Sequence, residues 1–113
     1  MKKTMAVDNS ILIGKVAEAV KEIVPRAKSI IYGSRARGDF RDDSDLDIIV
    51  LLPDSMSKEQ QRNIRKELHY RFYDLSIEFN YEIHISPIII TEGMFNERKT
   101  PFTVNVINEG IRL

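Results

Sequence analysis

Residues 32–50 read YGSRARGDFRDDSDLDIIV and contain the clearest structural and the clearest chemical signal of the chain. An apolar, β-branched run ends at Tyr32, the pair Gly33-Ser34 interrupts it, and a second apolar run begins at Leu46. Short apolar runs bounded by turn residues are typical of buried strands. We therefore expect strands over residues 28–32 and 46–52, joined by a polar and strongly charged connection.

The sequence on either side of this pair of strands is typical of helices. Apolar residues recur at helical spacing over residues 11–24, with Asn9 or Ser10 available as the N-cap. A capping-box pattern at Ser57 begins a longer helix, which we expect to continue to about Glu78. In the order of the chain, an amphipathic helix is thus expected before the two strands and another after them.

The last third of the chain predicts one more strand and two more helices. The third strand is expected over residues 81–90, and Pro87 within it indicates an edge position or a bulge. Helices are expected over residues 92–98 and 102–108, the second of them capped by Gly110. This order predicts a small α/β (α+β) domain with a mixed sheet. Helices would cover one face of the sheet, which leaves the other face free to hold a site.

Composition limits the class of protein. A length of 113 residues predicts a single domain over residues 1–113. The 17 Lys and Arg residues balance 17 Asp and Glu residues, which argues against non-specific binding to nucleic acid or to an anionic membrane. The absence of cysteine excludes disulfides and thiolate zinc sites. Neither MKKTMAV at the N-terminus nor an apolar run such as residues 48–52 is long enough for a signal peptide or a membrane span. We expect a soluble, cytoplasmic protein.

Asp45 and Asp47 are the strongest candidates for a metal site. They stand two residues apart at the start of a predicted strand, so both side chains should project from the same face. Two carboxylates held close together repel each other unless a cation joins them. Such oxygen ligands suit Mg²⁺ or Mn²⁺, which keep positions open for water and substrate phosphates.

The Gly33-Ser34 turn, separated from Asp45 by ten intervening residues, is the candidate phosphate site. Glycine lets the backbone come close to a ligand, and N–H groups at the start of a helical turn attract phosphate oxygens. Arg37 would add charge-assisted contacts to a polyphosphate, and we count Ser44 in the same nucleotide-binding set. Taken singly, a glycine–serine turn and an acidic strand start are common structural features. Together on neighbouring strands they are the minimum equipment for phosphoryl or nucleotidyl transfer.

The segment 33–50 resembles the signature of the polymerase-β-like nucleotidyltransferase superfamily, in its minimal single-domain branch. This resemblance implies the polymerase-β-like fold, with Gly33 and Ser34 on the triphosphate of ATP and with Asp45 and Asp47 on Mg²⁺. It also implies a function, because many minimal members are antitoxins encoded beside a helical HEPN toxin. Characterised members transfer AMP to a tyrosine of that toxin, and this disarms it.

The family usually carries a third carboxylate on a later strand. Alternation over the predicted strand puts Glu82, His84 and Ser86 on one face. We assign Glu82 as the third catalytic and metal-binding residue, with His84 as the alternative if the register shifts by two.

The main hypothesis is an enzyme that transfers AMP from ATP to a protein hydroxyl. The alternative is a weak or inactive module of the same fold that neutralises a partner by binding. A polymerase-like enzyme acting on nucleic acid is disfavoured by the zero net charge and the lack of a second domain.

The C-terminal segment, residues 102–111, predicts a partner surface. It carries several apolar residues late in the chain, where few elements remain to cover them. We expect part of this surface to contact a HEPN-type protein or a second copy of the chain. The alternative is that its helix packs only on the domain's own sheet.

Overall fold

The computed structural model describes residues 8–113, so the segment 1–7 used in the signal-peptide argument lies outside the described residues. The helices are α1 (Asn9–Ile23), α2 (Ser34–Arg37), α3 (Lys58–Glu78), α4 (Glu92–Glu97) and α5 (Pro101–Glu109), and the strands are β1 (Lys28–Tyr32), β2 (Leu46–Leu52), β3 (Ile85–Thr91) and β4 (Ile111–Arg112). This order confirms the predicted α/β class. None of the helices within residues 8–113 is long and apolar enough to cross a membrane.

The strands form one mixed sheet in the order β3-β2-β1-β4. β1 is antiparallel to both β2 and β4, whereas β2 and β3 are parallel. Parallel neighbours need a long crossover connection, and here α3 lies between them in the chain. β3 lies at an edge of the sheet, so the prediction from Pro87 is confirmed.

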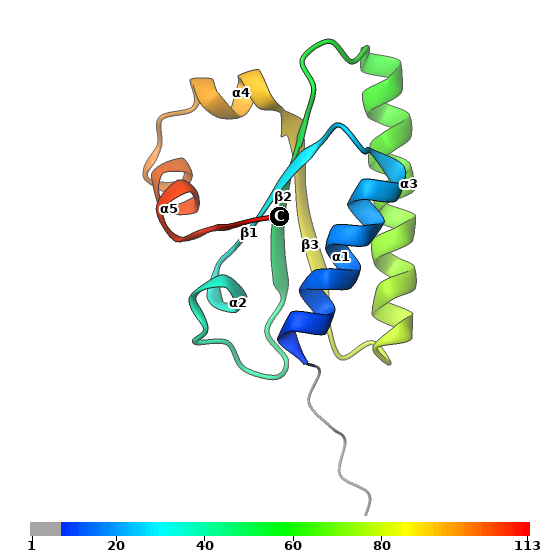
Figure 1. The fold of residues 1–113 in the computed structure, drawn as a ribbon, viewed down its shortest axis with the longest axis vertical. Coiled ribbons are helices and arrows are strands. Elements are labelled where there is room, and N and C mark those ends of the chain that lie inside the picture. The colour runs from blue at the N-terminus through cyan, green and yellow to red at the C-terminus, as the bar shows by residue number, and fades with distance from the viewer. Residues whose placement is uncertain (1–7) are drawn as a thin grey trace, which may run out of the picture.

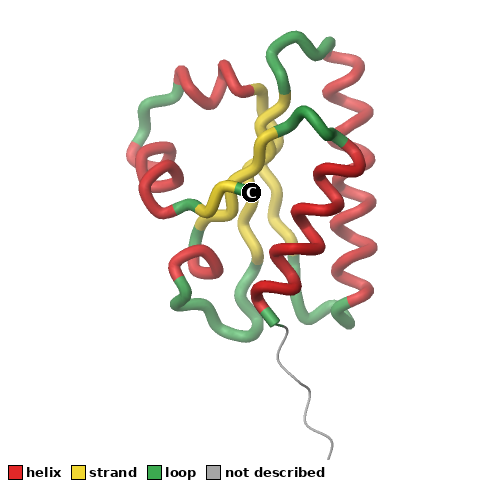
Figure 2. The backbone as a smooth tube through the Cα atoms, in the orientation of Figure 1, coloured by secondary structure: helices red, strands yellow, loops and turns green. Residues whose placement is uncertain are grey.

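Helices lie on both faces of this sheet. α1 and α3 cover one face, whereas the short α4 and α5 lie on the other (Figures 1 and 2). Alternate β2 residues divide between the two layers: Ile48 and Val50 belong to the larger core, and Ile49 and Leu51 to a smaller one with Phe95 of α4. The prediction that helices cover only one face and leave the other free is therefore wrong, because α4 and α5 pack on the second face. That second face carries Asp47, which remains partly exposed.

Most element boundaries agree with the predictions. β1 and β2 have the expected limits, and the Ser57 capping box with Gln60 is present at the start of α3. The N-cap of α1 is Asp8 and not Asn9 or Ser10, because the Asp8 carboxylate accepts hydrogen bonds from the amides of the next turn. Asn9 is instead the first helical residue.

The third strand begins later than predicted. Asn80 and Tyr81 both have positive φ angles, of 57° and 59°, so the chain turns sharply after α3. Pairing with β2 then starts at Ile85, which leaves Glu82 and His84 before the strand. The two-residue strand β4, which pairs with Ile30 and Ile31 of β1, was not predicted.

Candidate active site

Gly33 forms the junction between β1 and α2 in a conformation that other residues avoid. Its φ and ψ angles are 78° and −159°, a region that is essentially restricted to glycine. A Cβ atom at this position would lie 2.6 Å from Oδ2 of Asp47. The candidate phosphate turn and the candidate metal ligand are therefore in direct van der Waals proximity, although the sequence separates them by fourteen residues.

Asp47 lies on the second face of the sheet, one residue after the start of β2. Its neighbours in the sheet are Tyr32 of β1 and Ser86 of β3. Burial raises the pKa of the Asp47 carboxyl above its usual value of 3.8, and the nearby charge of Asp45 raises this pKa further. Both effects oppose a second negative charge at this point. A divalent cation would offset this repulsion, so the two carboxylates are suited as ligands of one Mg²⁺ or Mn²⁺ ion.

The structure does not bring Glu82 into this group. Its amide donates to the Phe79 carbonyl at 3.2 Å, in the turn that follows α3, and Glu82 precedes the first β3 residue by three positions. Among residues 8–113 no set of three or more His, Asp or Glu side chains is placed to share a metal ion. The predicted strand position of Glu82 is thus wrong: the turn at Asn80 and Tyr81 leaves this residue before β3.

His84 and Ser86, which were predicted to share a face with Glu82, lie in different surroundings. His84 accepts a backbone hydrogen bond from Leu46, and it lines a cavity of about 200 Å³ together with His69 and Phe72 of α3. Ser86 is the β3 residue directly opposite Asp47. Because Ile88 packs into the core of the second face, alternation places Ser86 on that face as well. A hydroxyl, and not a third carboxylate, therefore stands beside Asp47.

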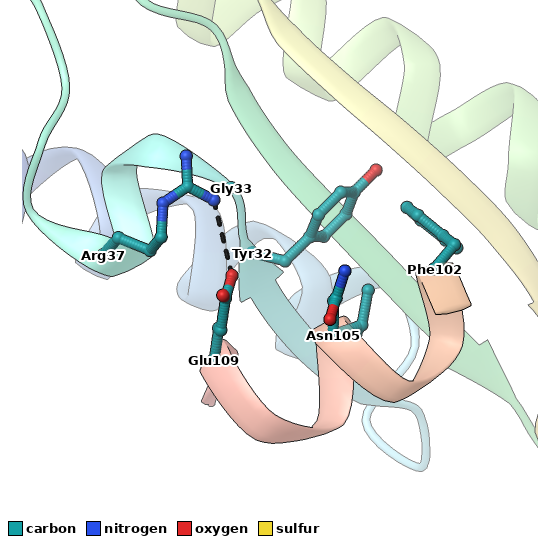
Figure 3. A pocket seen from close by; sticks show the side chains of 7 residues that line it. Tyr32, Gly33, Arg37, Phe102, Asn105 and Glu109 are labelled. Atoms are coloured by element: carbon teal, nitrogen blue, oxygen red, sulfur yellow. Dashed lines mark hydrogen bonds and ion pairs between the residues drawn. The ribbon is translucent and has the colours of Figure 1, made fainter. Parts of the chain in front are cut away.

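Arg37 borders a second cavity, of about 170 Å³, that adjoins Gly33 (Figure 3). Its Nη1 lies 3.4 Å from Oε2 of Glu109 at the end of α5, and its Nε lies 3.3 Å from Oδ2 of Asp39. All three side chains are well exposed, so these ion pairs contribute little to stability and a polyphosphate could replace them. Arg37 is thus positioned to contact a ligand beside Gly33.

The wall of this cavity is aromatic. The rings of Tyr32 and Phe102 meet edge to face, with centroids 5.4 Å apart, and Asn105 of α5 lines the same space (Figure 3). Burial raises the pKa of the Tyr32 phenol above its usual value, and the charge of Asp47 adds to this effect. Tyr32 therefore lies between the acidic pair and the cavity.

Ser44 of the connecting loop and Arg35 of α2 have roles that the sequence did not show. The Ser44 hydroxyl accepts a hydrogen bond of 2.8 Å from the amide of Arg41, so this side chain holds a turn of the loop.

Arg35 is only 2% exposed. Burial lowers the pKa of its guanidinium, while the charges of Asp42 and Asp45 oppose that shift. No local pattern distinguishes Arg35 from Arg37, and only the packing shows that one is buried and the other exposed.

Comparisons with known proteins agree on the fold and the family. A family model described as "Nucleotidyltransferase domain" matches residues 13–109. A protein of Methanocaldococcus jannaschii named "Putative protein adenylyltransferase" is 34% identical over 85 residues, which cover 74% of this chain and 75% of that protein. A solved structure from Sulfolobus solfataricus described as "a putative nucleotidyltransferase" has a TM-score of 0.56 at 22% identity, and the match covers 98% of this chain and 87% of that protein. A toxin–antitoxin structure with AMP-PNP has a TM-score of 0.53 at 16% identity, and the match covers 88% of this chain and 69% of that one.

Proposed function

The chain belongs to the nucleotidyltransferase domain family, and on this premise we propose that it transfers AMP from ATP to a hydroxyl group of a protein side chain, with Mg²⁺ or Mn²⁺. The observation that carries the proposal is the contact between Gly33 and the Asp47 carboxylate, because it joins a phosphate turn to an acidic pair. The protein acceptor is supported by the name of the relative that is 34% identical.

Each residue of the site has a defined part in this reaction. Gly33 and Ser34 would bind the triphosphate through the backbone, and Arg37 would exchange its contact with Glu109 for a phosphate oxygen. Asp45 and Asp47 would hold the cation, which when bound supplies charge neutralisation for the phosphates. The acceptor oxygen forms a bond to the α-phosphorus, the bond from that phosphorus to the bridging oxygen breaks, and pyrophosphate leaves with the electron pair. The hydroxyl proton leaves to solvent.

The acceptor is proposed to belong to a HEPN-type toxin, for which this chain would be the antitoxin in the cytoplasm. α5 buries Thr103 and Val106 against the domain, which agrees in part with packing on its own sheet. Its remaining apolar side chains are exposed, and they continue into the C-terminal strand: Phe102, Val104, Ile107, Ile111 and Leu113. Phe102 lines the cavity beside Gly33, and we propose that these exposed residues contact a helical partner or a second copy of the chain. The toxin–antitoxin structure with a similar fold supports the first of these.

The test is pyrophosphate release from ATP and Mg²⁺ in the presence of the co-expressed neighbouring gene product. We expect release by the native chain and at least a hundredfold less by the variant that combines Asp45→Asn with Asp47→Asn. A control variant, Asp43→Asn, removes one exposed carboxylate from the same loop. Equal activity of all three proteins would show that the acidic pair does not hold the cation.

One observation favours a second function, neutralisation of the partner by binding alone. Ser86 stands where a third carboxylate would complete the site, and no three-residue acidic cluster occurs within residues 8–113. If this alternative holds, the double variant at Asp45 and Asp47 will still bind and inhibit the partner at native concentration. If the enzyme function holds, the same variant will lose inhibition even where it still binds.

A further inference from the structure

Arg35 anchors the loop that leads to the acidic pair. The buried guanidinium makes hydrogen bonds to four acceptors on two segments of the chain: Nε to the Ser44 carbonyl at 2.9 Å, Nη1 to Asn9 Oδ1 at 3.0 Å, and Nη2 to the carbonyls of Asp42 at 3.2 Å and Arg41 at 3.5 Å. The ring of Phe40 covers it, with the guanidinium carbon 4.8 Å from the ring centroid. The Arg35 side chain is thus engaged by protein atoms, so a nucleotide cannot use it.

The position of Asp45 depends on this anchor more than the position of Asp47 does. Asp47 lies inside β2, where strands on both sides hold it. Asp45 precedes β2 and is exposed, and its chain neighbour Ser44 is the residue whose carbonyl Arg35 binds most closely. Between that bond and the first β2 residue, Leu46, only Asp45 intervenes.

We propose that Arg35 is a positioning residue, which holds the loop of residues 38–45 so that the Asp45 carboxylate meets the same cation as Asp47. This inference rests on the proposed function. The planar guanidinium can reach several carbonyls at once, whereas an ammonium group would offer one point charge. The role therefore depends on the shape of the donor group and not on its charge alone.

Asn9 completes the arrangement from the other side. Its Nδ2 donates to the Arg35 carbonyl at 3.1 Å while its Oδ1 accepts from the Arg35 side chain. The pair of bonds ties the first turn of α1 to α2. Removal of the Asn9 side chain should therefore loosen the same loop, but less than removal of the guanidinium, since three of its carbonyl contacts remain.

The test compares Arg35→Met, Arg35→Lys and Asn9→Ala with Arg65→Met as the control. Arg65 of α3 donates to a backbone carbonyl too, that of Ile89 in the edge strand β3, at 3.2 Å. The readouts are the Mn²⁺ dissociation constant by calorimetry, kcat and KM for ATP, and amide hydrogen exchange at Arg41 and Ser44. For Arg35→Met we expect at least tenfold weaker Mn²⁺ binding, at least tenfold lower kcat, KM within about threefold, and at least tenfold faster exchange.

The control and the conservative variant separate positioning from general stability. Arg65→Met should change none of these readouts by more than about twofold. If Arg35→Lys restores native Mn²⁺ binding, or if folded Arg35→Met keeps native Mn²⁺ affinity and exchange, the proposal is overturned. Should Arg35→Met not fold, Asn9→Ala decides it, with about threefold effects expected and no effect overturning it. If the native chain binds no Mn²⁺, the proposed function fails, and the exchange rates alone then report whether Arg35 holds the loop.

Discussion

Replacement of Gly33 by alanine tests the link between the phosphate turn and the acidic pair. The φ of 78° and ψ of −159° at Gly33 place the new side chain in a strained region, at a cost of about 1–3 kcal/mol. The added Cβ would also approach Asp47 Oδ2 to 2.6 Å, so the carboxylate must leave its rotamer, which costs about 0.5–1.5 kcal/mol. We therefore expect the free energy of unfolding to fall by about 2–4 kcal/mol.

Gly38→Ala provides the matched control for this substitution. Gly38 also has a positive φ, 92°, but a Cβ there would meet no other atom within 4 Å. Its cost should be the conformational one alone, about 1–2 kcal/mol. Urea unfolding gives both stabilities, and calorimetry with Mn²⁺ and with Mg²⁺–ATP gives the affinities. Only Gly33→Ala should weaken binding, by at least tenfold, and the bulkier Gly33→Val should abolish it.

A second substitution identifies why Gly33→Ala lowers the free energy of unfolding. If the Asp47 carboxylate is the obstacle, adding Asp47→Ala to Gly33→Ala should recover part of the lost stability, since the crowded oxygen is gone. Additive effects of the two changes would indicate backbone strain alone. The reasoning is refuted if Gly33→Ala is no more destabilising than Gly38→Ala and binds Mg²⁺–ATP with native affinity.

Three further outcomes are expected. Combining Asp45→Asn with Asp47→Asn should abolish Mn²⁺ binding measured by paramagnetic broadening and leave the circular dichroism spectrum unchanged; native Mn²⁺ affinity would contradict the assignment. Because the folded pKa of Asp47 is raised above 3.8, its contribution to the stability of the metal-free protein should fall as pH rises from 3.8 through that raised pKa. Asp47→Asn should therefore increase the free energy of unfolding at pH 7, by under about 1 kcal/mol since the group is partly exposed. Thermal unfolding should show this as a higher midpoint temperature, and a lower midpoint would contradict the sign. Gly110→Ala places a Cβ against the Val106 carbonyl and should cost about 1–3 kcal/mol in urea unfolding, whereas Gly14→Ala, which meets open space on α1, should gain about 0.5–1 kcal/mol.

The parts of the fold that depend on local pattern could be predicted from the sequence. The limits of β1 and β2 follow from continuous apolar runs, and the start of α3 follows from a capping box between Ser57 and Gln60. β4 could not be predicted, because two residues carry no periodicity and pair only where β1 offers a free edge. The late start of β3 depends on two non-glycine residues with positive φ, and the propensities of Asn80 and Tyr81 do not specify that turn.

The candidate site shows the same division between local and tertiary information. Spacing alone predicted that Asp45 and Asp47 share a face; the structure places Asp45 one residue before β2, where its charge adds to the raised pKa of Asp47. The correction at Glu82 arises from a shift of the strand, since a later start moves the residue beside Asp47 to Ser86. The burial of Arg35 results from packing between α1, α2 and the loop that follows α2; Asn9 of α1 lies 26 residues from Arg35, so no single segment shows it.

The most direct measurement of the central claim uses ATP labelled at either the α- or the γ-phosphate. Native protein, Mg²⁺ and the co-expressed partner are incubated with each form, and protein-bound label is counted after denaturation. A nucleotidyltransferase leaves the α-label on protein and releases the γ-label in pyrophosphate, and the variant that combines Asp45→Asn with Asp47→Asn should leave neither label on protein. Transfer of the γ-label, or α-label transfer that persists in the double variant, would contradict the account.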